Sequence, residues 1–262
     1  MKPVSKKNIQ EFWTRNVPGV AVASLELTPQ DKQFYKQIDD YRIRFEPCVV
    51  PLLDSLAEKG ELVLEIGCGS GSDSRYLAKK GVNIVSLDLS PSNVHLTLTG
   101  AHLFGLNGKG VCADAEMLPF KDGIFDAIYS FGVLHHTPDT QKAINEICRV
   151  LKPGGQCCVM LYHKGYAYFL IKAYGIISLK YLFKPEERLV SDLYDQTPLS
   201  KMYSKKAARN LFNNFKEVRF EVNTYGGIQT NRKLRWIYKL LNKFPFLMAR
   251  LGTFLIVKAI KY

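Results

Sequence analysis

A glycine-rich turn that directly follows a short apolar run constrains this chain more than any other feature. Residues 61–66 (ELVLEI) are typical of a buried strand, and the turn at 67–71 (GCGSG) follows it without a spacer. Glycine reaches backbone conformations that other residues avoid, and it lets a ligand approach the main chain closely. A helix is expected next, over 72–80. This strand, turn and helix predict the first unit of an α/β sheet.

The same alternation continues along the chain. Six further strands are expected at 82–87, 110–112, 125–130, 156–162, 217–222 and 254–259. Helices are expected at 139–151 and 204–215, among others, and residues 152–155 (KPGG) are expected to form a turn. Short apolar strands that alternate with helices are typical of parallel sheets. We therefore predict an α/β fold, doubly wound around a mostly parallel seven-stranded sheet.

Two kinds of segment fall outside this alternation. Residues 1–55 precede the first strand and are expected to form a helical N-terminal cap over the carboxyl edge of the sheet. Residues 56–262 then form the main domain, with insertions at about 163–203 and 223–252 that are long enough to form lids. A chain of 262 residues can bury a full core, so one domain with insertions is the simplest organisation.

Charge and hydropathy narrow the cellular setting. Residues 201–262 hold 14 Lys or Arg and two acids, which equals the whole net charge of +12. Such a bias concerns partners and solubility rather than fold. The amino end lacks the apolar region of a secretory signal, and no apolar run is long enough to span a bilayer. These features predict a cytoplasmic protein.

The six cysteines show no C-x-x-C spacing. We therefore expect buried free thiols rather than disulfides or metal ligands, and we predict no metal site. Cys157 and Cys158 are neighbours in a predicted strand, so their side chains should point to opposite faces of the sheet.

Three acidic side chains stand at the ends of three successive predicted strands. Glu65 lies two residues before the first glycine of the turn, Asp88 ends the second strand and Asp114 follows the third. Each alone could be a solvated loop acid, but the carboxyl ends of parallel strands meet in one crevice. An acid beside the glycine turn favours a cationic group and would repel a dinucleotide's phosphates. The three acids therefore predict a nucleoside with a positively charged tail, and they disfavour an NAD(P) oxidoreductase.

Four longer motifs bring a family into view. They are LVLEIGCGSGSDS (62–74), SLDLSPSNV (86–94), ADAEMLPFKDGIFDAIYSFGVLHHTPD (113–139) and RVLKPGG (149–155). On these motifs the chain resembles the class I S-adenosylmethionine (SAM)-dependent methyltransferases. The similarity is greatest to enzymes of ubiquinone and menaquinone pathways and to bacterial small-molecule methyltransferases. The resemblance implies a Rossmann-like fold and SAM as cofactor, and it covers 62–162 most strongly.

The resemblance also implies a cofactor-binding set at the glycine turn and the strand ends. Its members are Glu65, Gly67, Cys68, Gly69, Gly71, Asp73, Asp88, Leu89, Asp114, Ala115 and Ser130. In this scheme the turn and Glu65 line the methionine moiety, while Ser130 faces the cofactor from the fourth strand. Asp73 lies at the amino end of the following helix and could reach the methionyl carboxylate.

The nucleoside moiety and the cap complete that scheme. Asp88 and Leu89 would hold the ribose, and Asp114 and Ala115 would flank the adenine. The N-terminal stretch looks like a cap that some bacterial members fold over SAM. Its polar and aromatic side chains could contact cofactor or substrate, or could serve for packing. These cap residues are Tyr35, Tyr41, Arg42 and Arg44.

Histidines supply the candidates for a general base. Methyl transfer from a sulfonium needs a base only where the nucleophile must lose a proton, because alignment otherwise suffices. His135 and His136 follow the fourth strand and His163 follows the fifth. Histidine titrates near neutral pH, and we favour His136 as the base. The alternative is that the two adjacent histidines organise the loop.

The methyl acceptor is the least determined part. Segment 231–251 is predicted to be basic and amphipathic, so it could make peripheral contact with an anionic membrane or pack as a lid. We predict methyl transfer to an O, N or C atom of a small, partly apolar metabolite, hydrophobic or anionic. The alternatives are an RNA (tRNA) methyltransferase that uses the basic C-terminal region, and a non-catalytic SAM-binding protein. The sequence shows no separate RNA-binding module, which argues against nucleic acid as a partner.

Overall fold

Seven strands form one sheet in the computed structural model, which describes residues 4–58, 61–177, 184–223 and 243–262. The strands are β1 (Leu62–Ile66), β2 (Asn83–Asp88), β3 (Lys109–Cys112), β4 (Phe125–Phe131), β5 (Leu151–Tyr162), β6 (Phe215–Asn223) and β7 (Phe254–Lys261). Their order is β3-β2-β1-β4-β5-β7-β6. Strands β1 to β5 pair in parallel, and β7 runs antiparallel to both of its neighbours. The predicted Rossmann-like, mostly parallel seven-stranded fold is therefore confirmed.

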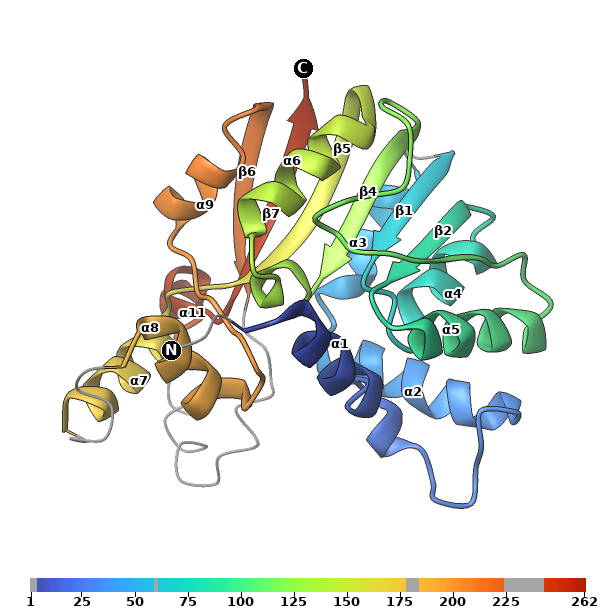
Figure 1. Ribbon diagram of the computed structural model, residues 1–262, viewed down its shortest axis with the longest axis horizontal. Helices are drawn as coiled ribbons and strands as arrows, with labels where there is room; N and C mark the ends of the chain where they lie inside the picture. The colour runs from blue at the N-terminus through green and yellow to red at the C-terminus, as the bar shows by residue number, and fades with distance from the viewer. Residues whose placement is uncertain (1–3, 59–60, 178–183, 224–242) are drawn as a thin grey trace.

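Helices cover both faces of the sheet (Figure 1). The described helices of the whole chain are α1 (Lys6–Arg15), α2 (Lys32–Phe45), α3 (Val49–Ala57), α4 (Ser72–Lys79), α5 (Pro91–Leu103), α6 (Thr140–Val150), α7 (Tyr166–Ile177), α8 (Glu186–Val190), α9 (Lys205–Leu211) and α11 (Pro245–Leu251). Shorter helical turns are η1 (Val20–Val22), η2 (Leu134–His136) and η4 (Ser191–Asp195). Helices α5, α6 and α9, which the sequence predicted, each begin directly after a capping residue. Ser90, Asp139 and Ser204 each accept a main-chain N–H from the first turn of their helix.

Two cores lie on the two faces of the sheet. On one face, Ile144 and Ile147 of α6 and the residues around α9 pack against β1, β4, β5 and β7. On the other, α3 and α4 pack their apolar sides against the alternate residues of the same strands. Cys157 belongs to the first core and Cys158 to the second, which confirms their opposite orientation. The sheet is thus buried on both faces, and its free edge at the strand ends is where a site can form.

Two local expectations are wrong. Residues 152–155 do not leave the sheet as a turn: they lie within β5, where the register against β4 shifts between Phe125 and Ala127. Gly154 takes the left-handed conformation there, with φ of 75°, so the extra residues form an irregularity inside the strand. All six cysteines are free as expected, but Cys112 is exposed because β3 is an edge strand.

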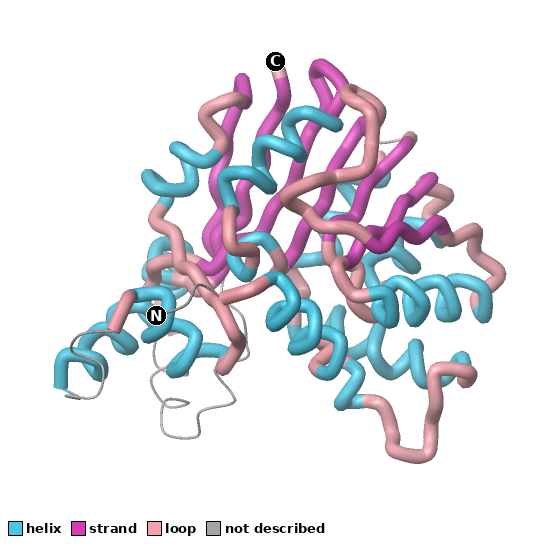
Figure 2. Tube along the Cα trace, viewed as in Figure 1, coloured by secondary structure: helices cyan, strands magenta, loops and turns pink. Residues whose placement is uncertain are grey.

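The N-terminal helices gather at the edge where the parallel strands end (Figure 2). In α1, Gln10 donates to the carbonyl of Leu89 at 2.7 Å, and Thr14 donates to the hydroxyl of Ser90 at 2.7 Å. Helix α2 packs its apolar side against α5. The predicted division at residue 55 falls inside α3, which packs on the sheet, and that division remains a prediction.

The two predicted insertions are described in part. The first contains α7, α8 and η4, and the second contains α11. Residues 231–242 of the predicted basic amphipathic segment lie outside the described residues. Within the four described ranges, no helix combines the length and the apolar character that crossing a bilayer requires.

Candidate functional site

The glycine turn joins β1 to α4 and presents bare main chain at the edge of the sheet. Gly67, Gly69 and Gly71 have φ of 83°, 53° and 77°, a region that favours glycine. The main-chain nitrogen of Gly67 donates to the carbonyl of Leu87 at 2.6 Å, which fastens the turn to β2. A Cβ on Gly67 would lie 2.2 Å from a methyl of Val133, whereas one on Gly69 would meet nothing closer than 3.9 Å. The turn is therefore packed tightly at Gly67 and less tightly at Gly69, and Cys68 between them is buried.

Asp88 ends β2 directly beside this turn. One carboxylate oxygen accepts the N–H of Gly69 at 3.0 Å; the other accepts the N–H of Ser90 at 2.9 Å and the amide of Asn93 at 3.2 Å. The side chain is buried, and burial raises the pKa of Asp88, while these donors act in the opposite direction. Asp88 is therefore held firmly at the end of β2, beside the glycine turn. Leu89, next in sequence, uses its carbonyl to hold α1.

Asp114 follows β3 and is covered by the cap. Lys6 of α1 forms an ion pair with its carboxylate and with Glu116, the latter at 2.6 Å. The other oxygen of Asp114 accepts the N–H of Glu116 at 2.9 Å, and Ala115 between them is buried. Because Lys6 reaches across from α1, the cap and the third strand end close on one another.

Glu65 lies beneath the glycine turn and is only 3 % exposed. It accepts a hydrogen bond from Ser74 of α4. Burial and the neighbouring charge of Asp73 raise the pKa of Glu65 to about 8, against the effect of the Ser74 hydroxyl. A protonated acid at this place can ionise when a cation binds beside it. Ser130 is also buried, but its hydroxyl donates to the carbonyl of Ile66 at 3.1 Å and so ties β4 to β1.

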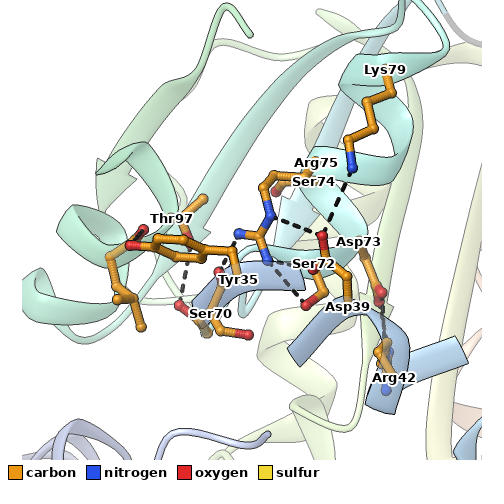
Figure 3. Close-up of polar contacts among 12 residues, drawn as sticks. Tyr35, Asp39, Arg42, Ser70, Ser72, Asp73, Ser74, Arg75, Lys79 and Thr97 are labelled. Atoms are coloured by element: carbon orange, nitrogen blue, oxygen red, sulfur yellow. Dashed lines mark hydrogen bonds and ion pairs between the residues drawn. The ribbon is translucent and has the colours of Figure 1, made fainter. Parts of the chain in front are cut away.

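A buried arginine holds the glycine turn from behind (Figure 3). Arg75 of α4 has no exposed surface; it donates to the carbonyl of Ser70 at 2.6 Å and pairs with Asp39 of α2. Its guanidinium also lies 4.7 Å from the ring centre of Tyr35. On the other side of the turn, Thr97 donates to the carbonyl of Gly69 at 3.2 Å. The cap helix and the turn are therefore locked together through Arg75.

A second ion pair links the cap to the start of α4. Arg42 donates to both carboxylate oxygens of Asp73, at 3.0 and 2.6 Å, and Tyr129 donates to the same group at 2.9 Å. The Arg42 guanidinium lies over the ring of Phe131. Asp73 is thus engaged by protein groups, and its predicted contact with a methionyl carboxylate remains a prediction. The other two cap candidates, Tyr41 and Arg44, contact Phe45 of their own helix.

The histidine pair lies in η2, just past the end of β4. His136 is buried: its Nδ1 lies 2.7 Å from the carbonyl of Leu199 and 3.1 Å from the hydroxyl of Ser200. Its Nε2 faces the carboxylate of Asp195 at 4.0 Å. Burial lowers the pKa of His136, although Asp195 acts in the opposite direction. The imidazole is therefore neutral at neutral pH, as a base must be.

Aromatic rings surround the pair. The centre of the His135 ring lies 3.7 Å from that of Tyr162 and 4.2 Å from that of His136. Trp13 of α1 lies 5.0 Å from His136 on another side. Burial holds the pKa of His135 well below its ordinary value, so this ring is neutral as well.

His163 occupies a different setting. Its Nδ1 lies 2.8 Å from the carbonyl of Gly252, and its main chain bridges to Thr253 and Tyr203. Burial lowers the pKa of His163 too. The ring therefore joins the end of β5 to the segment before β7, and its catalytic role remains a prediction without a supporting contact.

Comparisons with known proteins agree with this geometry. A family model described as a methyltransferase domain matches residues 64–159. The ubiquinone biosynthesis O-methyltransferase of Coxiella burnetii is 33 % identical over 48 % of this chain and 52 % of its own. Sterol 24-C-methyltransferase of Eremothecium gossypii is 30 % identical over 77 % of this chain and 52 % of its own. Residues 64–159 of this chain therefore match a methyltransferase domain.

A solved structure supports the fold of this methyltransferase domain. Magnesium protoporphyrin IX methyltransferase from Synechocystis, crystallised with S-adenosylhomocysteine (SAH), superposes with a TM-score of 0.61 at 16 % identity. The match covers 98 % of this chain and all of the other. The chain spans about half the length of the two curated relatives named above.

Several residues of the methyltransferase domain escaped the sequence analysis. Asp39 and Arg75 lie 36 positions apart, and nothing in the sequence marks them as a buried pair. Asp195 and Ser200 lie about 60 positions beyond His136, inside a predicted insertion. Only the folded chain brings them together. In the part of the chain that the structure describes, no group of three or more His, Cys, Asp or Glu side chains could hold a metal ion.

Proposed function

We propose that this chain is a SAM-dependent methyltransferase that transfers a methyl group to an O, N or C atom of a small, partly apolar metabolite. The observation that carries this proposal is that Glu65, Asp88 and Asp114 stand at or just past the ends of three neighbouring strands, next to the glycine turn. These three carboxylates suit a nucleoside with a cationic tail and would repel a pyrophosphate.

The residues present fit the cofactor. Asp88 is a buried carboxylate at the end of β2 that would accept hydrogen bonds from ribose hydroxyls, and Leu89 would lie next to it along the ribose. Glu65 lies where an ammonium group would favour its ionised form, with Gly67, Cys68, Gly69 and Gly71 forming the turn above it. Asp114 and Ala115 would flank the adenine, and Asp73 and Ser130 complete the predicted set. When bound, SAM supplies an activated methyl group on a sulfonium.

The chain's own part is then to align the acceptor and exclude water. Helix α1 closes the edge of the sheet through Lys6, Gln10 and Thr14, which lie one helical turn apart. Trp13, on the same helix, covers the histidine pair. The aromatic side chains past β4 suit an acceptor with an apolar body.

The remaining predictions about partners belong to this proposal. A hydrophobic or anionic small molecule fits the aromatic walls and the basic C-terminal part. A cytoplasmic location, peripheral membrane contact through 231–251 and the absence of nucleic acid as a partner rest on the sequence alone. The relatives named above methylate different kinds of molecule by their names, so they do not single out an acceptor.

Transfer of labelled methyl groups tests the proposal. The purified chain is incubated with methyl-labelled SAM and, separately, a small-molecule extract and total tRNA of the cells that make it. We expect label in a small organic product and in no RNA, and we expect Asp88→Asn to reduce it. Label in tRNA would replace the proposal by the RNA alternative. SAH binding without any labelled product would favour the non-catalytic alternative.

A further inference from the structure

Among the described residues, three buried ring nitrogens just past β4 have no hydrogen-bond partner: Nε2 of His136 and both nitrogens of His135. A carbonyl oxygen only accepts hydrogen bonds, so the 2.7 Å contact with Leu199 requires the proton of a neutral His136 to sit on Nδ1. Nε2 then carries a lone pair. It is buried, and among the described residues nothing forms a hydrogen bond with it. Buried polar atoms nearly always have partners, so this atom indicates a ligand that donates a proton.

The group that faces this lone pair is itself an acceptor. The Asp195 carboxylate, 4.0 Å from Nε2, accepts hydrogen bonds from Ser200 and from the hydroxyl of Thr197, the latter at 2.9 Å. It stands at the end of the π-helical turn η4, and Gln196 after it takes a left-handed conformation with φ of 58°. Such turns cost energy and are frequent at functional sites. The turn therefore fixes a negative charge next to a base.

Two acceptors that face each other gain when a proton arrives between them. Protonation of Nε2 would place a positive charge beside Asp195 while Nδ1 keeps its bond to Leu199. Burial holds the ring neutral before reaction, and Asp195 stabilises it afterwards. His135 and Tyr162 are the other titratable side chains against the ring, and burial keeps His135 neutral.

We propose that His136 is the general base that removes the proton of a phenolic hydroxyl on the acceptor, and that Asp195 is its positioning residue. This inference rests on the proposed function and narrows it to oxygen. An aromatic amine is neutral at pH 7 and attacks through its free lone pair, and an alkene carbon has no proton to lose beforehand. A phenol, with an acidity near that of tyrosine, lies within reach of an imidazole. The rings of Trp13 and Tyr162 suit a planar acceptor.

The step balances without a further reactant. The hydroxyl proton passes to Nε2 as the oxygen lone pair forms a bond to the methyl carbon. The bond between that carbon and the sulfonium breaks, and its electron pair stays on sulfur. The products are an aryl methyl ether, SAH and a protonated His136, which later returns its proton to water.

NMR of the imidazole nitrogens tests the proposed roles of His136 and Asp195 before the acceptor is known. In SAH-bound protein with labelled histidines, we expect a neutral His136 with its proton on Nδ1 at pH 7; His136→Gln assigns its signals. Asp195→Asn should lower the pKa of His136 because it removes the charge that stabilises the imidazolium. The matched change Asp192→Asn, on the same turn but paired with Lys184 and Arg188, should leave it unchanged. A proton on Nε2, or an unmoved pKa in Asp195→Asn, overturns the proposal.

The position of a transferred label tests the substrate class. With carbon-13 methyl SAM and the cell extract, we expect the product signal in the methoxy region. His136→Gln should lower kcat about 100-fold or more and remove the rise of kcat with pH, while SAH affinity stays within about twofold. The exposed His102→Gln should change neither. Label on nitrogen or carbon, or full turnover in His136→Gln, overturns this proposal and leaves the proposed function standing. Failure to bind SAH would instead overturn the proposed function.

Discussion

The cofactor half and the acceptor half of this molecule are built in different ways. The cofactor half comes from short, nearly contiguous stretches around the ends of β1, β2 and β3, and its main acids accept hydrogen bonds from groups close by. The proposed acceptor half gathers Trp13, His136 and Asp195 from three distant parts of the chain, and among the described residues the buried Nε2 of His136 has no hydrogen-bond partner. A cofactor site that many proteins share can be built from residues close together in the sequence. A site that selects one acceptor depends on packing between distant segments.

The buried pair of Arg75 and Asp39 behind the glycine turn should show the largest effect on stability. Arg75→Met leaves Asp39 and the carbonyl of Ser70 without their buried partner, so we expect the free energy of unfolding to fall by about 3 kcal/mol in urea titrations. Adding Asp39→Leu should recover part of the loss. The control Arg219→Met removes an arginine that is 80 % exposed and should cost less than about 0.5 kcal/mol. Equal losses of unfolding free energy in the two variants would show that buried Arg75 contributes no more to stability than exposed Arg219.

Asp88 should set the affinity of the cofactor half. Asp88→Asn replaces a carboxylate that can take charge-assisted hydrogen bonds, each worth about 1.5–3 kcal/mol. We expect SAH to bind about 10- to 100-fold more weakly by calorimetry. The exposed Asp122→Asn serves as the control. Unchanged affinity in Asp88→Asn would remove the ribose assignment.

Glu65 should make binding depend on pH. Its pKa of about 8 in the free protein keeps it mostly protonated at pH 7, and the ammonium group of SAH favours the carboxylate. Binding should therefore release protons, and affinity should rise with pH up to about 8. Calorimetry at pH 7 in buffers of different ionisation enthalpy measures this release, which Glu65→Gln should abolish. A binding enthalpy that does not depend on the buffer would show that the ammonium group of SAH does not bind beside Glu65.

The same group has a consequence for the free protein. A carboxyl whose pKa is raised on folding binds its proton more tightly in the folded state. The ordinary pKa of this group is 4.5, and its pKa in the folded protein is about 8. Glu65 therefore lowers the free energy of unfolding as the pH rises through this range.

His163 should show the smallest effect and mark the border of the acceptor half. Its Nδ1 is bonded to Gly252, so His163→Gln should cost about 1 kcal/mol of stability or less and change kcat less than about twofold. Thermal unfolding and initial rates measure both. A loss of kcat as large as that of His136→Gln would extend the acceptor site to the end of β5.

Sequence patterns predicted the fold because it depends on local order; the cofactor-binding role of the strand-end residues stays a prediction. A buried strand, a glycine turn and an acid at the next strand end are neighbours in sequence as well as in space. Residues 152–155 were mispredicted because Pro and Gly mark an irregularity without saying whether the strand continues through it. Asp195 could not be predicted, since its contact with His136 depends on the packing of a turn from an insertion.

The most direct test of the central claim is a calorimetric titration of the purified chain with SAH, set beside the same titration with NAD and NADP. We expect a single SAH site that is weakened in Asp88→Asn, with no binding of either dinucleotide. Absence of SAH binding, or preference for a dinucleotide, would contradict it, because the glycine turn and its three acids would then serve another ligand.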